Sequence, residues 1–126
     1  MTPERFVLVG RSLGSGVAVE VARRGHGRGL VLLSPFTSVV EAVRGFVGPL
    51  ATLVVQDRFD SIAKIGELSL PIVVIHGMDD GLVPFAHGER LVAAARDARL
   101  VPLPGVGHDD LGDLGAHVGR AIATIP

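Results

Sequence analysis

The sequence has no cysteine, no tryptophan and no tyrosine. Of the three residues Phe, Trp and Tyr, only phenylalanine is present. Without cysteine the chain can form no disulfide, no thiolate metal site and no cysteine nucleophile. An aromatic content of 4% argues against a platform on which nucleic-acid bases stack. The formal net charge is −1, whereas a surface that binds phosphates needs an excess of basic residues. These absences exclude disulfide scaffolds, and we expect no nucleic-acid partner.

Long apolar runs and targeting patterns are also missing. The longest uninterrupted apolar stretch, residues 46–55, contains Gly48 and Pro49. It is much shorter than the roughly 20 residues that a membrane-spanning helix requires. The first five residues lack the charged and then apolar pattern of a signal peptide. We therefore expect no membrane span and a cytoplasmic location.

The sequence otherwise has the composition of a packed globular protein, with 48% hydrophobic and 20% charged residues in 126. This length is typical of one domain, so we expect a single domain over residues 1–126. Short apolar runs predict buried strands at residues 6–9, 30–33, 72–75 and 99–103. Helical spacing predicts helices at residues 13–24, 39–46, 85–97 and 110–125, and a brief turn at 60–65. Alternating strands and helices, with strands apolar on both faces, predict an α/β fold with a parallel sheet between helices.

Residues 10–14, Gly-Arg-Ser-Leu-Gly, lie between a predicted strand and a predicted helix and match the G-x-S-x-G pattern of a nucleophile elbow. In such an elbow Ser12 occupies a strained turn, so we expect Gly10 and Gly14 to be required for steric reasons. The turn exposes the serine hydroxyl above the sheet, and the Leu13 backbone N–H lies near any oxyanion that forms there. A glycine-rich structural turn is the alternative. A nucleotide-binding module is disfavoured, because the glycines do not match G-x-G-x-x-G and no G-K-[ST] follows.

An acid and a histidine follow two further predicted strands. Asp79 and Asp80 come after the strand at residues 72–75, and His108 follows the last strand. The carboxyl ends of parallel strands meet at one edge of the sheet, where ligands bind in open α/β folds. The chain order of serine, acid and histidine is that of the α/β-hydrolase triad. His108 can then take the proton of Ser12 near neutral pH, and the acid holds one imidazole tautomer.

Six stretches together resemble the C-terminal half of an α/β-hydrolase, in the branch that includes serine-aminopeptidase-like, acylglycerol-lipase-like and palmitoyl-thioesterase-like members. They are residues 7–16, 33–38, 58–62, 75–80, 83–88 and 105–111. The resemblance implies a serine hydrolase that cleaves an ester, thioester or amide bond of a small-molecule acyl substrate. In the family's motif the acid is the third residue after the glycine, which selects Asp80 over Asp79. The implied triad is Ser12, Asp80 and His108, with no cofactor and no metal ion.

We expect the remaining polar residues near these motifs to be structural or to lie in solvent. Asp79 is interpreted as a solvated turn residue, and Arg11 as either a substrate contact or a solvated side chain. His76 is interpreted as a hydrogen-bonded structural residue, and His87 and His117 as surface or packing residues.

The resemblance begins at the family's fifth strand, so the sequence predicts a truncated domain without the strands that precede the elbow. The missing half would donate the second oxyanion N–H, and loss of one such donor typically costs about 10²- to 10³-fold in rate. The strand at residues 6–9 would then have an unpaired, apolar edge. We expect either a second copy or an N-terminal half to pair there. The alternative function is therefore a weak or inactive fragment that acts by binding a partner.

Overall fold

Four parallel strands form one sheet in the computed structural model, which describes residues 5–37, 61–108 and 114–126. The strands are β1 (Val7–Arg11), β2 (Gly29–Leu33), β3 (Ile72–Gly77) and β4 (Ala98–Leu103). Their spatial order is β1-β2-β3-β4, and each pairs in parallel with the next along the chain. The predicted four-stranded α/β architecture is therefore confirmed.

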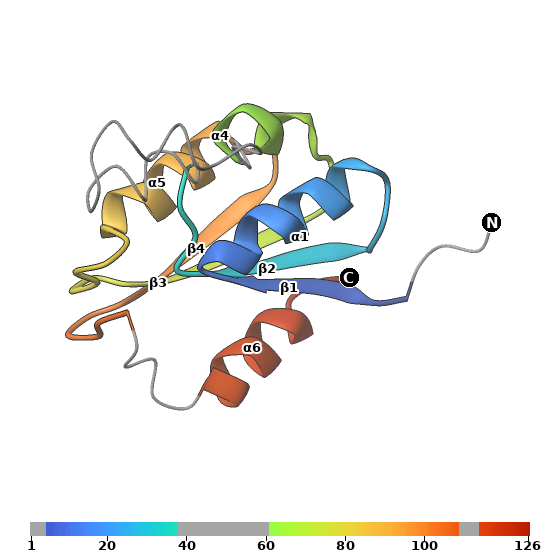
Figure 1. Ribbon diagram of the computed structural model, residues 1–126. Helices are drawn as coiled ribbons and strands as arrows, with labels where there is room; N and C mark the ends of the chain where they lie inside the picture. The colour runs from blue at the N-terminus through green and yellow to red at the C-terminus, as the bar shows by residue number, and fades with distance from the viewer. Residues whose placement is uncertain (1–4, 38–60, 109–113) are drawn as a thin grey trace.

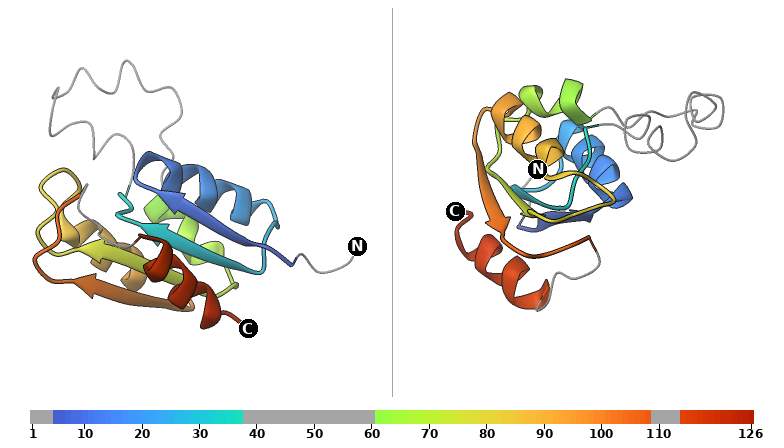
Figure 2. Two further views of the ribbon diagram at one scale, coloured as in Figure 1. Left: turned by 90° about the horizontal axis from the view of Figure 1, so that it is seen from below. Right: turned by 90° about the vertical axis from the view of Figure 1, so that its left-hand side faces the viewer.

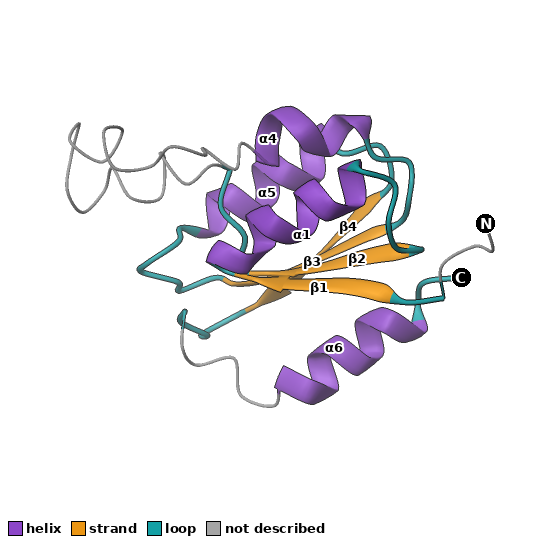
Figure 3. Ribbon diagram, turned by 45° about the vertical axis from the view of Figure 1, so that its right-hand side comes forward, coloured by secondary structure: helices purple, strands orange, loops and turns teal. Residues whose placement is uncertain are grey.

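Helices cover both faces of the sheet, as the sequence predicts. They are α1 (Leu13–Arg23), α4 (Ser61–Lys64) with the 3₁₀ turn η2 (Ile65–Glu67), α5 (Phe85–Ala94) and α6 (Leu114–Ala123). Figures 1 and 3 show α1, α4 and α5 on one face of the sheet and α6 on the other. The sheet is thus the middle layer of three, which is the arrangement that strands buried on both faces require.

The alternation of side chains along β2 builds a separate core on each face of the sheet. Leu30 and Leu32 are fully buried among residues of α1, β3 and α5. Their neighbours Val31 and Leu33 face the opposite way and pack with Ala121 and the end of α6. Successive residues of a strand point to opposite faces, so this continuous apolar run serves both cores.

The edge strands and one helix differ from the sequence-based expectation. Strands β2 and β3 are buried along their whole length, but β1 and β4 are partly exposed, so the expectation that every strand is buried is wrong for the two edges. Pro102 fits within β4 because an edge strand tolerates a missing N–H donor. Helix α5 ends at Ala94 instead of residue 97, since Ala95 is already extended (φ −82°, ψ 156°) ahead of β4.

Some predicted elements lie outside the described residues: the helix at 39–46, the cap at Asp60 and the start of the helix at 110–125. Within the described part of the chain, no helix combines the length and apolar character needed to cross a membrane. The described loops that follow β1, β3 and β4 leave the sheet at one edge, because all the strands run in the same direction (Figure 2). Residues that carry chemistry in the sequence therefore gather at this carboxyl edge.

Candidate active site

Ser12 occupies the sharp turn between β1 and α1. Its backbone has φ 51° and ψ −116°, a region that residues other than glycine rarely adopt. Its N–H donates to the Leu33 carbonyl of β2 at 2.8 Å, and its own carbonyl accepts the amide and the hydroxyl of Ser15 at 3.0 and 2.6 Å. The turn is therefore held from the sheet on one side and from the helix on the other.

The two glycines of the elbow have different roles. A Cβ on Gly10 would lie 2.6 Å from the Gly14 carbonyl oxygen and 2.8 Å from the Ala18 Cβ, so only glycine fits there. A Cβ on Gly14 would meet none of the described atoms within 4 Å. The expectation of a steric requirement is correct for Gly10 and wrong for Gly14, because the space that a Gly14 side chain would enter is open. Leu13 begins α1, a position at which a backbone N–H has no partner inside the helix.

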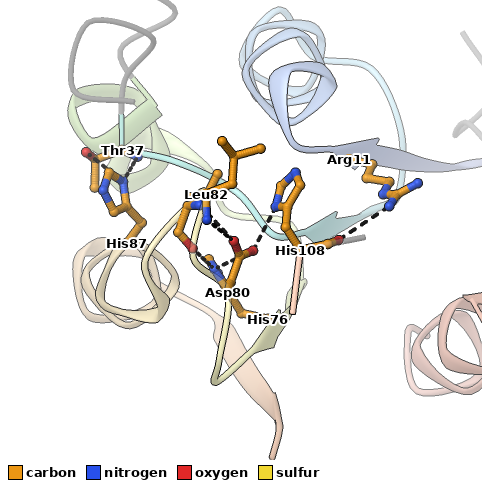
Figure 4. A network of polar contacts seen from close by, with 8 residues as sticks. Arg11, Thr37, His76, Asp80, Leu82, His87 and His108 are labelled. Carbon is orange, nitrogen blue, oxygen red and sulfur yellow. Dashed lines mark hydrogen bonds and ion pairs between the residues drawn. The ribbon is translucent and has the colours of Figure 1, made fainter. Parts of the chain in front are cut away.

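Asp80 lies in the loop after β3, and its carboxylate has no solvent-exposed area. Oδ1 accepts the backbone N–H groups of Leu82 at 2.9 Å and Val83 at 2.7 Å, which closes a tight turn around the side chain. Oδ2 accepts from Nδ1 of His108 at 2.8 Å (Figure 4). Its neighbour Asp79 is exposed, so the two adjacent acids differ in their exposure to solvent.

His108 follows β4 and is 10% exposed at its side chain. An ionised carboxylate only accepts hydrogen bonds, so the bond to Asp80 fixes the imidazole hydrogen on Nδ1. The other ring nitrogen, Nε2, then carries the lone pair of the neutral imidazole and can accept a proton. The pair thus has the chemistry of a general base held by a buried acid.

The elbow and the loop of His108 are neighbours at the carboxyl edge. The Arg11 guanidinium donates to the His108 carbonyl oxygen at 3.4 Å, which brings this loop beside the residue that precedes Ser12 (Figure 4). Between the described residues, no hydrogen bond joins the Ser12 hydroxyl to His108. Catalytic hydrogen bonds are often loose without substrate. The structure therefore pairs His108 with Asp80 and leaves Ser12 unpaired with them.

Two further histidines pack beneath this edge. His76, the penultimate residue of β3, is fully buried, and Nε2 lies 2.7 Å from the Val83 carbonyl oxygen and 3.5 Å from Oδ2 of Asp80. Burial lowers the pKa of His76 and favours its neutral form. His87 on α5 is also buried, and its Nδ1 accepts the backbone N–H of Thr37 at 3.0 Å. His76 is hydrogen-bonded and His87 is buried, in agreement with the structural role predicted for the first and the packing role for the second. The position of His76 behind the acid has no signal in the sequence beyond its place before Gly77.

Across residues 5–37, 61–108 and 114–126, no group of three histidine, aspartate or glutamate side chains forms a candidate metal cluster. The site instead consists of a strained serine, a buried carboxylate and an imidazole. These groups are suited to nucleophilic and acid–base chemistry.

A parallel sheet between helices, with a strained serine turn after one strand and an acid and a histidine after later ones, is the arrangement found in the class of the α/β-hydrolases. Comparisons with known proteins agree, and sequence and fold together identify the chain as a partial α/β-hydrolase. An uncharacterised protein of Mycobacterium tuberculosis is 45% identical over 111 residues, covering 86% of this chain and 39% of the relative. Human alpha/beta hydrolase domain-containing protein 17B is 30% identical over 119 residues, covering 94% and 40%.

Solved structures support the same fold. The esterase domain of a Rhodothermus marinus protein matches with a TM-score of 0.72 at 19% identity, covering 92% of this chain and 57% of that one. An esterase from a Rhodococcus species matches with a TM-score of 0.69 at 18% identity, covering 98% and 66%. No protein-family model matches the chain. The chain spans about two fifths of the length of the curated relatives it matches.

Proposed function

We propose that the chain carries the catalytic triad of a serine hydrolase that acts on ester, thioester or amide bonds. The observation that carries the proposal is the 2.8 Å bond between His108 Nδ1 and the buried carboxylate of Asp80, at the same sheet edge as the strained Ser12. The relative named as an α/β-hydrolase domain-containing protein and the structural neighbour named as an esterase domain support the proposal. The finer assignment to the branch of serine aminopeptidases, acylglycerol lipases and palmitoyl thioesterases stays a prediction.

The proposed reaction proceeds through an acyl-enzyme. The Ser12 hydroxyl attacks the substrate carbonyl carbon while Nε2 of His108 takes the hydroxyl proton. The Leu13 backbone N–H donates to the oxyanion, and Asp80 stabilises the imidazolium that forms. His108 returns the proton to the leaving group, which departs as an alcohol, thiol or amine. His108 then takes a proton from a water molecule that attacks the acyl carbon, and it returns this proton to the Ser12 oxygen as the bond between Ser12 and the acyl group breaks. The acid leaves and Ser12 is regenerated.

Labelling with a fluorophosphonate probe tests the nucleophile, because the probe reacts with an activated serine hydroxyl and displaces fluoride. We expect the 126-residue chain to be labelled and Ser12→Ala to lose the label entirely. Ser69→Ala, at an exposed position far from the elbow in sequence, is the matched control and retains it. Labelling that is absent from the wild type, or that survives in Ser12→Ala, contradicts the proposed nucleophile.

The acid is tested by a pair of adjacent variants. Asp80→Asn removes the charge that stabilises the imidazolium and favours the wrong tautomer, so we expect the rate of labelling to fall by about 10³- to 10⁴-fold. Asp79→Asn changes the same charge on an exposed side chain and leaves the rate within about threefold, the range of a surface substitution. Equal rates in the two variants would remove Asp80 from the triad.

A second candidate function is a weak or inactive hydrolase fragment that acts by binding a partner at the sheet edge. In the described residues, β1 pairs with β2 alone, so one side of β1 has unpaired backbone groups. We further propose that residues 1–126 form a single domain and that a second copy, or an N-terminal half, covers this side. A folded chain that binds a partner but is never labelled at Ser12 would favour this function.

A further inference from the structure

His76 fills the space directly behind the acid of the candidate triad. Its side chain is fully buried, and Nε2 lies within 2.7 Å of the Val83 carbonyl oxygen. A carbonyl oxygen only accepts hydrogen bonds, so Nε2 must carry the ring hydrogen. Oδ2 of Asp80 lies 3.5 Å from the same nitrogen (Figure 4). The donor therefore bonds to the far end of the acid's turn and lies beside the acid itself.

The opposite side of the ring is held by α5. Nδ1 is buried and has no hydrogen-bond partner in the described structure, as suits an unprotonated nitrogen of a neutral ring. A Cβ on Gly88 would lie 2.7 Å from Nδ1, so the helix backbone packs directly against this side. The ring also meets the Phe85 ring edge-on, with centroids 5.7 Å apart. These contacts aim Nε2 at the acid loop and leave the imidazole little room to turn.

The carboxylate of Asp80 is thereby enclosed by donors on both oxygens. Oδ1 accepts two backbone N–H groups, and Oδ2 lies between Nδ1 of His108 and Nε2 of His76. His76 belongs to β3, which like β2 is buried along its whole length. The acid and His108, in contrast, lie on loops. The His76 side chain therefore connects the loop that carries the acid to the buried sheet.

We propose that His76 is a positioning residue: its Nε2–H holds Val83 and Asp80 so that Oδ2 meets Nδ1 of His108. This inference rests on the proposed function for its effect on catalysis, but its structural consequence can be measured without any activity. His76 does not touch the substrate. Its role is to keep the acid and the base in register, because a displacement of about 1 Å in a catalytic group can cost about 10²-fold in rate.

The experiment compares the 126-residue wild type with His76→Gln and His76→Leu. Gln keeps an N–H donor near the position of Nε2, whereas Leu fills a similar volume without one. The first readout is the ¹H NMR signal of the His108 Nδ1 hydrogen, which shifts downfield in a short bond to a carboxylate. We expect His76→Leu to lose or broaden this signal and His76→Gln to retain it. The second readout is fluorophosphonate labelling of Ser12, expected to slow by about 10- to 100-fold in His76→Leu and to recover in His76→Gln.

A purely structural His76 would give another result. Both variants would then unfold at lower temperature, but the folded His76→Leu would keep the wild-type NMR signal and labelling rate, and this outcome overturns the inference. If His76→Leu does not fold, Gly88→Ala decides, because it crowds Nδ1 without removing any polar group. An unchanged His108 signal in a folded Gly88→Ala also overturns the inference. A wild type that shows the variant-sensitive signal but no labelling would instead contradict the proposed function alone.

Discussion

At the residue scale, the site depends on a backbone conformation that serine rarely adopts. The φ of 51° at Ser12 has a cost on the order of 1–3 kcal/mol, which persists only where the surroundings leave no alternative. Here the Leu33 carbonyl fixes the residue from the sheet, and Ser15 fixes its carbonyl from the helix. Ser34, at the end of β2, has a similar φ of 49° and a buried hydroxyl without a partner in the described structure. Two strained serines thus end adjacent strands at the same edge.

The elbow glycines give a prediction that separates steric need from sequence pattern. Gly10→Ala forces a Cβ against backbone and the Ala18 side chain, so we expect a loss of about 1–3 kcal/mol in the free energy of unfolding. Gly14→Ala has open space and a helical position, so it should leave stability unchanged or raise it by about 0.5–1 kcal/mol. Urea denaturation measures both. Similar losses in the two variants would contradict the difference in their environments.

Burial of a neutral His76 gives a prediction for pH. Burial lowers the pKa of His76 in the folded chain, so below its ordinary value of about 6.5 the unfolded chain binds a proton that the folded chain does not. Stability from this residue is therefore intact above that pH and falls as the pH decreases, by at most about 1.4 kcal/mol per pH unit. We expect His76→Gln, which does not titrate, to lose less stability between pH 7.5 and 5.5 than the wild type. Thermal unfolding at the two pH values measures the difference, and parallel losses would contradict it.

At the scale of elements, an ionic cluster joins α1 to α4. The Glu20 carboxylate accepts from Arg23 of the same helix at 3.0 Å, from the C-cap residue Arg24 at 2.7 Å, and from Lys64 of α4 at 2.9 Å. These cations, Arg23 foremost, hold the pKa of Glu20 well below its usual range. Its contribution to stability is present at neutral pH and decreases as the pH falls toward the pKa of an ordinary glutamate and below.

Neutralising this carboxylate should therefore weaken the contact between the two helices. We expect Glu20→Gln to lower the temperature of unfolding at neutral pH and low salt. The difference from the wild type should shrink in about 1 M salt, where the Debye length is about 3 Å. Glu89→Gln, on the exposed face of α5, is the matched control and should change little. A Glu20→Gln effect that is equal at low and high salt would argue against an ionic tether.

The elements were predictable from the sequence because the strands are short apolar runs bounded by glycine and proline. Their ends were less predictable: α5 stops at Ala94, although residues 95–97 continue its pattern, because the chain must enter β4 at Ala98. Within the site, the resemblance to the family, and not the local pattern, distinguished Asp80 from Asp79. The packing of Gly88 on His76 joins residues of different elements, so no local pattern reports it.

At the scale of the whole molecule, the sheet is not covered evenly. Strand β1 is an edge of the described sheet, and it exposes Val9 (46%) together with the preceding Phe6 (48%). An apolar edge strand with unpaired backbone groups favours pairing with another chain. The curated relatives are longer, so in a protein of their length other segments are available to lie against this side. For the 126-residue chain, a second copy is the available partner.

Self-association through β1 is therefore the expected behaviour of the isolated chain. In a symmetric pair the β1 strands of two copies would run side by side, so a charge at Val9 would face its own counterpart or lie within the covered surface. We expect Val9→Lys to weaken dimerisation by about tenfold or more, which corresponds to about 1.4 kcal/mol. Sedimentation velocity over a concentration series measures the effect.

The control for this prediction introduces the same charge at another apolar residue of similar fractional exposure. Met78 is 47% exposed and follows β3, a central strand that is paired on both sides. Met78→Lys should therefore leave the dimer as stable as in the wild type, whereas Val9→Lys should not. If both variants weaken association to the same degree, the contact depends on general hydrophobicity and not on the strand edge. A chain that stays monomeric at every concentration would show that β1 does not pair between copies.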